Sequence, residues 1–174
     1  MKRSDFEIMA PVGSYDSLTA AIQGGADSVY FGIEGLNMRA RSSNNFTIDD
    51  LHEIVRICNE HHIKSYLTVN TVIYDEDIPL LHRIIDAAKE AGLSAIIASD
   101  VAAMTYAREI GVEVHLSTQL NISNTEALRF YARFADVVVH KALFIVDIHN
   151  PDGAGQAEPT IQYCNCLLYT SPSP

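Results

Sequence analysis

The sequence is short of positive charge, and this limits what the protein can bind. It has 12 Lys and Arg residues against 22 Asp and Glu residues, which gives a formal net charge of −10. Broad binding to nucleic-acid phosphates requires clustered basic side chains, so the composition argues against it. Arg39 and Arg41 form one local basic spot with few acidic neighbours, which indicates either a substrate-binding anion site or two solvated loop arginines.

Long apolar segments are also missing. No stretch approaches the roughly 20 apolar residues that span a bilayer, and the first residues are charged rather than the apolar segment of a secretory signal. We therefore expect a cytoplasmic protein without a membrane span.

Cysteine is scarce, with three residues in the chain, and an odd number without a secretion signal predicts no disulfide framework. Cys58 falls on the apolar face of a predicted helix, which indicates a buried thiol. Cys164 and Cys166 have one residue between them, whereas zinc and redox pairs commonly have two. Most histidines fall on predicted helices without the spacing of metal ligands, so we predict no metal site in this chain.

Strand-like apolar runs alternate with amphipathic helical patterns along the chain. The predicted strands are Glu7–Pro11, Ser28–Phe31, Lys64–Val69, Ala95–Ala98, Val112–Leu116 and Asp136–Val139. Such alternation is typical of parallel strands joined by crossover helices. Two architectures fit it: an open doubly wound sheet, and an incomplete TIM-like (β/α) barrel of about six parallel strands. The first strand lacks a Gly-x-Gly-x-x-Gly turn, so we favour the barrel, whose open sheet edges would favour self-association.

The pattern weakens after Val139. Residues 144–148 form at most one more strand, and the chain beyond Asn150 is rich in Pro, Gly and Ser without a regular period. We therefore predict a partial barrel domain at residues 1–143 and a disordered or artefactual tail at residues 144–174. The last residues resemble translated sequencing-adapter DNA, which suggests a truncated gene product.

Polar residues gather where the predicted strands end, and this is the functional edge of parallel α/β folds. The sharpest catalytic hypothesis is a triad of His115, Ser117 and Asp100. Asp100 also suits the role of a helix cap, and residues two apart on a strand lie side by side, about 6–7 Å between Cα atoms.

A second interpretation makes these strand ends a substrate-binding mouth. Its candidate members are Asn70, His115, Ser117, Gln119 and Asn121. Their amides and hydroxyls would orient a substrate, and His115 could move a proton near neutral pH. The same residues could instead form a satisfied hydrogen-bond network inside the barrel, since buried polar groups must be paired in either case.

Several stretches, in this order and spacing, resemble the start of peptidase family U32, the collagenase-like peptidases. They are Glu7–Gly13, Ala20–Gly32, Asn37–Arg41, Asn45–Thr47, Tyr66–Thr71, Ser99–Asp100, His115–Asn121 and Asn124. The resemblance covers residues 5–139 and implies a barrel-like catalytic domain that hydrolyses peptide bonds.

Other members of that family are implicated in oxygen-independent hydroxylation of an RNA base or of the ubiquinone ring, with an iron–sulfur cluster bound by cysteines further along the chain. Those cysteines are absent here, and Cys164 and Cys166 do not match them. Three functions therefore stay open: a peptidase acting on a peptide or protein, a hydroxylase component acting on RNA or a quinone, and an inactive fragment or binding module. We expect no cofactor in this chain itself.

Overall fold

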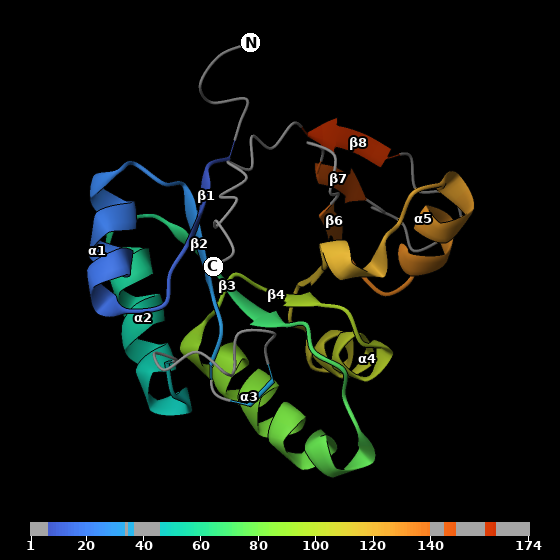
Figure 1. Cartoon of the computed structure of the whole chain (residues 1–174), viewed down its shortest axis with the longest axis horizontal. Coiled ribbons are helices and arrows are strands. Elements are labelled where there is room, and N and C mark those ends of the chain that lie inside the picture. The colour runs from blue at the N-terminus through green and yellow to red at the C-terminus, as the bar shows by residue number, and fades with distance from the viewer. Residues whose placement is uncertain (1–6, 34, 37–45, 140–144, 149–158, 163–174) are drawn as a thin grey trace, which may run out of the picture.

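The strands of the protein follow one another across the sheet in the order in which they occur in the sequence. The computed structural model describes residues 7–33, 35–36, 46–139, 145–148 and 159–162. Its parallel strands, each paired with the next, are β1 (Met9–Pro11), β2 (Ser28–Phe31), β3 (Lys64–Val69), β4 (Ala95–Ala98), β5 (Val114–Leu116) and β6 (Val137–Val139) (Figure 1). A doubly wound sheet reverses its order at a switch point. The uninterrupted order therefore confirms the partial barrel and excludes the doubly wound alternative.

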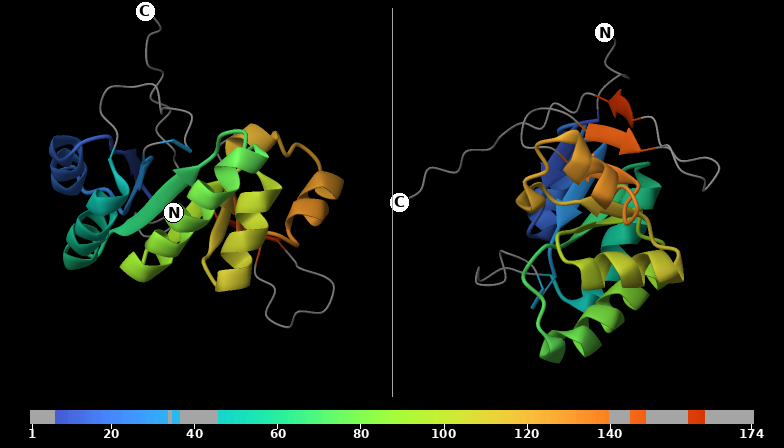
Figure 2. Two further views of the ribbon diagram at one scale, coloured as in Figure 1. Left: turned by 90° about the horizontal axis from the view of Figure 1, so that it is seen from below. Right: turned by 90° about the vertical axis from the view of Figure 1, so that its right-hand side faces the viewer.

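The helices that connect these strands lie along one side of the sheet. They are α1 (Tyr15–Gln23), α2 (Ile48–Glu60), α3 (Ile78–Ala91), α4 (Val101–Ile110) and α5 (Thr125–Tyr131). Crossovers between parallel strands are generally right-handed, so helices are expected on one side of a sheet whose strand order never reverses. Figures 1 and 2 show the result, an arc of helices outside a curved sheet. None of the helices in the described ranges has the length and hydropathy of a membrane span, and a cytoplasmic location stays a prediction.

Polar side chains cap the starts of several helices. Thr47 caps α2: its hydroxyl accepts from the backbone N–H of Asp50, whose carboxylate accepts from the backbone N–H of Thr47 at 2.8 Å. This reciprocal pair satisfies two backbone donors that the first helical turn leaves free. Asn124 caps α5, and its side-chain oxygen accepts from the N–H of Ala127 at 2.9 Å.

The main core lies between the outer face of the sheet and the helices. Val29, Leu67 and Ile96 point outward from neighbouring strands and join Leu51 of α2 and Ile84 of α3 in one cluster of fully buried side chains. Complete burial of such a side chain contributes about 1.5–3 kcal/mol. This layer therefore fixes the curvature of the sheet and, with it, the position of the opposite face.

The inner face of the sheet has its own smaller cluster. Met9, Tyr66, Ala95 and Ile97 are buried there, and Tyr30 packs against them. Alternate residues of a strand point to opposite faces. On β3 and β5, the inward-pointing residues are therefore those on the same face as this cluster. The inner face is where polar side chains also collect.

The end of the described chain differs from the tail that we expected. The segment at 144–148 was considered as one further strand, and β7 (Ile145–Ile148) confirms it, paired antiparallel to β6. Beyond Asn150 the sequence predicts no regular structure, whereas β8 (Pro159–Gln162) pairs antiparallel to β7. A parallel strand needs a crossover of about a dozen residues or more, and residues 140–144 are too few for one. The domain boundary after residue 143 stays a prediction.

Candidate functional site

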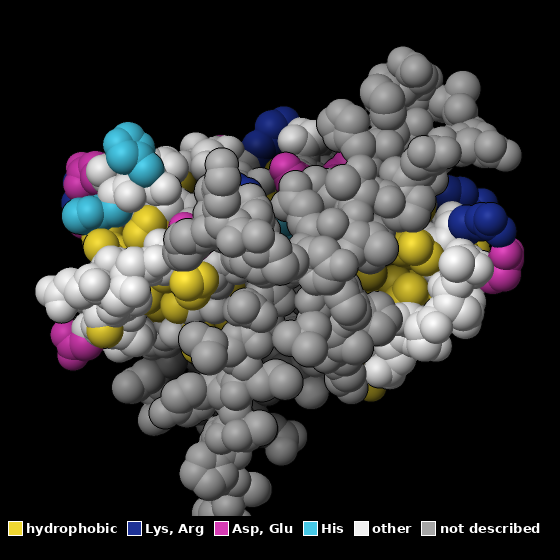
Figure 3. Space-filling view, turned by 90° about the horizontal axis from the view of Figure 1, so that it is seen from above, with side chains coloured by type: hydrophobic (Ala, Val, Ile, Leu, Met, Phe, Trp, Pro, Cys, Tyr) yellow, Lys and Arg dark blue, Asp and Glu magenta, His cyan; other side chains and the backbone are white. Residues whose placement is uncertain are grey.

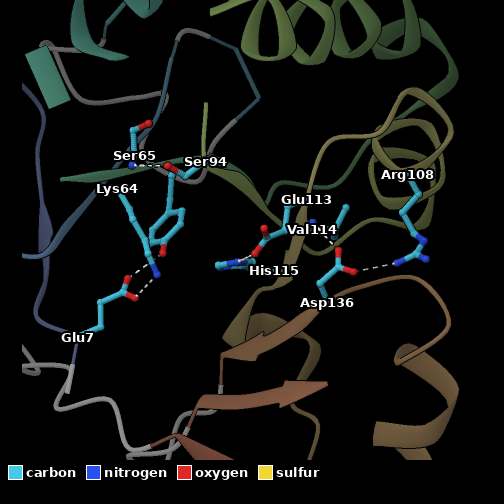
Figure 4. A network of polar contacts seen from close by, with 10 residues as sticks. Glu7, Lys64, Ser65, Ser94, Arg108, Glu113, Val114, His115 and Asp136 are labelled. Atoms are coloured by element: carbon cyan, nitrogen blue, oxygen red, sulfur yellow. Dashed lines mark hydrogen bonds and ion pairs between the residues drawn. The ribbon is translucent and has the colours of Figure 1, made fainter. Parts of the chain in front are cut away.

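Three charged residues lie at the amino ends of alternate strands on the inner face. Glu7 comes just before β1, Lys64 is the first residue of β3, and Glu113 comes just before β5 (Figure 4). In a (β/α) barrel, the side chains of alternate strands meet in one interior layer. The Nζ of Lys64 lies 2.9 Å from an Oε of Glu7. We call these three residues the amino-end charge cluster.

The buried ring of Tyr66 extends this cluster into the sheet. Its hydroxyl donates to Glu7 at 2.7 Å, and only 3% of the residue is exposed. Burial raises the pKa of Glu7, but the hydrogen bonds from Lys64 and Tyr66 outweigh it, so the pKa lies below its usual value. Glu7 is therefore a carboxylate at neutral pH and accepts from both donors.

His115 lies in the middle of β5 and faces the same interior. Its Nε2 is 2.8 Å from Oε1 of Glu113, two residues earlier on the same strand, and 5% of the residue is exposed. The hydrogen bond with His115 lowers the pKa of Glu113 against the opposing effect of burial. The imidazole also packs against the ring of Tyr66, with centroids 4.8 Å apart. Ala95 pairs with Tyr66 on the intervening strand β4, and its small side chain leaves room for this contact.

The other ring nitrogen of His115 has a different environment. Its Nδ1 is buried and makes no hydrogen bond within the part of the chain that the structure describes. A buried polar atom without a partner costs about 1–3 kcal/mol, and such atoms are uncommon in native proteins. This atom is therefore the clearest candidate for contact with a ligand.

The structure does not bring the predicted triad into hydrogen-bond contact. Asp100 accepts from the N–H of Ala102 at 2.8 Å and so caps α4, as its alternative role required. The Ser117 hydroxyl accepts from the N–H of Gln119 at 3.4 Å. Among the described residues, neither side chain bonds to His115, whose Nε2 is directed to Glu113 instead. The catalytic roles of Asp100 and Ser117 stay predictions.

The predicted substrate mouth is also arranged differently. Ser117 keeps an extended backbone, but Gln119 does not share the alternation of the strand, because β5 ends at Leu116 and a short 3₁₀ helix, η3 (Thr118–Leu120), follows. The side chain of Ser117 caps the start of η3, and Asn121 at its end adopts a left-handed backbone with φ of 50°. Its amide donates to the carbonyl of Gln119 at 3.1 Å.

The remaining residues of the predicted binding site are Asn70, Arg39 and Arg41. Asn70 directly follows β3, so it lies at the same carboxyl edge of the sheet as η3. Arg39 and Arg41 lie outside the described residues. On the face shown in Figure 3, the coloured Lys and Arg side chains stand at separate places with Asp and Glu side chains nearby, rather than as one basic surface.

Sequence reasoning missed Glu113, although the signal was present. Glu113 and His115 are two residues apart in a predicted strand, and alternation alone puts them on one face. The triad hypothesis placed the partners of His115 at the carboxyl ends of the strands, where barrel active sites lie. Glu7, Lys64 and Tyr66 were missed for the same reason.

The described residues offer no metal or thiol centre. No group of three or more His, Cys, Asp or Glu side chains in the described ranges is placed to hold a metal ion. Cys58 is fully buried, and burial raises the pKa of its thiol to about 11. A thiolate nucleophile at Cys58 is therefore disfavoured. Cys164 and Cys166 lie outside the described residues.

The fold and this polar inner face define half of a parallel (β/α) barrel. The chain belongs to peptidase family U32, whose family model matches residues 13–150. It is 77% identical over 139 residues to a collagenase of Porphyromonas gingivalis, covering 80% of this chain and 34% of that protein. It is 33% identical over 127 residues to tRNA hydroxylation protein P1 of Bacillus subtilis, covering 72% of this chain and 30% of that protein.

A solved structure of a U32 peptidase has the same fold. It superposes with a TM-score of 0.64 at 13% identity, covering 78% of this chain and 58% of that one. The chain spans about a third of the length of the two curated relatives. These similarities confirm the family and the barrel fold that the sequence indicated, and they leave the activity of the whole protein to be proposed.

Proposed function

We propose that this chain forms the amino-terminal half of the barrel of a U32 enzyme that hydrolyses peptide bonds, with His115 as its general base. The observation that carries the proposal is the environment of His115. One ring nitrogen is held by a carboxylate, while the other is buried without a partner in the described part of the chain. The 77% identity to a protein named collagenase supports the choice of substrate class.

Water is the nucleophile that this arrangement favours. The Ser117 hydroxyl is engaged as the cap of η3, and the thiol of Cys58 is buried on the helix side of the sheet. In the proposed step, Nδ1 of His115 takes a proton from water as the water oxygen bonds to the peptide carbonyl carbon. The same proton then passes to the leaving amine when the C–N bond breaks, so the overall reaction is hydrolysis.

The experiment is a gelatin-cleavage assay with the complete protein that contains this chain. We expect His115→Gln to lower kcat by about 10²–10⁴-fold, which is the usual contribution of a general base. His52→Gln is the matched control, because His52 is exposed on α2, away from the inner face. If His115→Gln cleaves gelatin as fast as the unmodified protein, the proposal fails.

Hydroxylation of an RNA base is the second candidate. The similarity to tRNA hydroxylation protein P1 favours it, as does the lack of a serine or thiol nucleophile bonded to His115 among the described residues. The iron–sulfur cluster that we expected for such members does not fit the described residues, because no suitable group of ligands is present there. Its ligands would have to come from the remainder of the complete protein.

Mass spectrometry separates these two functions. Transfer RNA from cells with and without the gene would differ by one added oxygen per modified base if hydroxylation is the activity. Identical tRNA together with gelatin cleavage would support the peptidase, whereas modified tRNA without cleavage would replace it with the hydroxylase.

A further inference from the structure

The hydrogen bond between His115 and Glu113 constrains where the imidazole carries its proton. An ionised carboxylate can only accept hydrogen bonds, so Nε2 must be the donor in this 2.8 Å contact. In a neutral imidazole one nitrogen donates and the other accepts. The contact with Glu113 therefore leaves Nδ1 as the acceptor.

The orientation of the ring is fixed by a second, independent contact. Tyr66 packs against the imidazole with an interplanar angle of 49°. Tyr66 is itself held, because its hydroxyl donates to Glu7, which also pairs with Lys64. Figure 4 shows the side chain of His115 beside Glu113 and extending from β5 toward Glu7 and Lys64. Rotation of the ring would break one contact and disturb the other.

We propose that Glu113 is a positioning residue, which holds neutral His115 as the Nε2–H tautomer and presents the Nδ1 lone pair to the interior of the barrel. A lone pair at that atom takes a hydrogen-bond donor, such as the O–H of water or the N–H of an amide. The use of that lone pair in catalysis rests on the proposed function, whereas the tautomer itself does not.

Nuclear magnetic resonance of the histidine rings tests the tautomer directly. The 174-residue chain is labelled with 15N in its imidazoles, and the His115 signals are assigned by their loss in His115→Gln. At a pH where the ring is neutral, we expect Nε2 to carry the proton and Nδ1 to carry none. A protonated Nδ1 in the neutral ring would overturn the proposal without any further variant.

Glu113→Gln then tests the cause. A glutamine side chain offers both an acceptor oxygen and a donor amide, so it no longer dictates which nitrogen is protonated. We expect the variant to gain a substantial fraction of the Nδ1–H tautomer. Glu109→Gln is the control, since Glu109 is exposed on α4, and its spectrum should not change at His115. An unchanged tautomer in Glu113→Gln would refute the positioning role.

The activity of the same variant in the complete protein separates this inference from the proposed function. If His115 is the base, Glu113→Gln should lower kcat by about tenfold or more with little change in KM. A shifted tautomer with full activity would support the positioning role and reject His115 as the base. Loss of activity without a tautomer shift would reject the positioning role alone.

Discussion

The hydrogen bond between Tyr66 and Glu7 gives a quantitative test of the amino-end charge cluster. Replacing Tyr66 by Phe removes one hydroxyl and keeps the ring that packs against His115. The carboxylate of Glu7 then loses the Tyr66 hydroxyl, a donor 2.7 Å away on a residue that is 3% exposed. The substitution therefore isolates a polar contact from the packing around it.

The expected cost follows from the burial of each partner. A hydrogen bond to a charged group contributes about 1.5–3 kcal/mol. The ion pair of Glu7 with Lys64 is worth about 1 kcal/mol at most, because the Lys64 side chain is 60% exposed. We expect Tyr66→Phe to lower the free energy of unfolding by about 2 kcal/mol at neutral pH, since the exposed ion pair with Lys64 cannot replace the lost buried donor.

The cost of Tyr66→Phe should also depend on pH, because folding changes the pKa of Glu7. Folding lowers the pKa of Glu7, so the carboxylate stabilises the fold above its unfolded pKa of about 4.3. That contribution is lost as the pH falls through the folded pKa. The cost of Tyr66→Phe should therefore be largest near neutral pH and shrink in acid, as the pH falls through the lowered pKa of Glu7 and the carboxylate takes up a proton.

Urea titration followed by far-ultraviolet circular dichroism measures this free energy, since the chain contains no Trp for fluorescence. A double-mutant cycle with Glu7→Gln should give a coupling energy of about 1.5–3 kcal/mol with Tyr66→Phe. Tyr106→Phe is the matched control, because its hydroxyl donates to Asp86 on the exposed helix surface, and its cost should be smaller. An equal cost at neutral and acidic pH, or no coupling to Glu7, would refute the reasoning.

Three further predictions test the fold around this site. Ala95→Leu should force the rings of Tyr66 and His115 apart and cost about 1–3 kcal/mol by overpacking, with weaker ring-to-ring nuclear Overhauser effects as the measurement. Cys58 should resist alkylation in the native protein at about pH 8 and react once urea unfolds it; rapid native labelling would contradict its burial. Thr47→Ala should lower the unfolding free energy by about 1 kcal/mol through loss of the α2 cap, and an unchanged urea midpoint would count against that role.

The fold was readable from the sequence because its outer layer obeys simple periodicity. Strand β2 was predicted at Ser28–Phe31, as the structure has it, and the fifth strand was expected from Val112 but begins at Val114. The apolar residues that cover both faces of such strands leave little choice of structure. The antiparallel β7 and β8 were harder to predict, because their pairing depends on backbone hydrogen bonds between segments that carry no clear side-chain period.

The candidate site was only partly readable. His115 was found because a histidine is conspicuous in an apolar strand, but its partner was sought at Asp100, on another strand end. The choice between Asp100 and Glu113 depends on which way the imidazole turns within the interior, and sequence alternation does not encode that. Gln119 shows a second limit, because the Ser117 cap starts η3 and takes Gln119 out of the strand.

His115 joins two regions of the half-barrel that differ in character. Toward the amino ends of the strands it contacts Glu113, and through Tyr66 it reaches Glu7, so these groups are already paired. In barrel enzymes that end of the sheet serves stability, whereas chemistry takes place at the carboxyl ends. On the same face, the next inward residue toward the carboxyl end is Ser117. The paired groups at the amino ends of the strands restrain one side of the imidazole, and Nδ1 remains for contact with a ligand. A general base that is held in position requires both features.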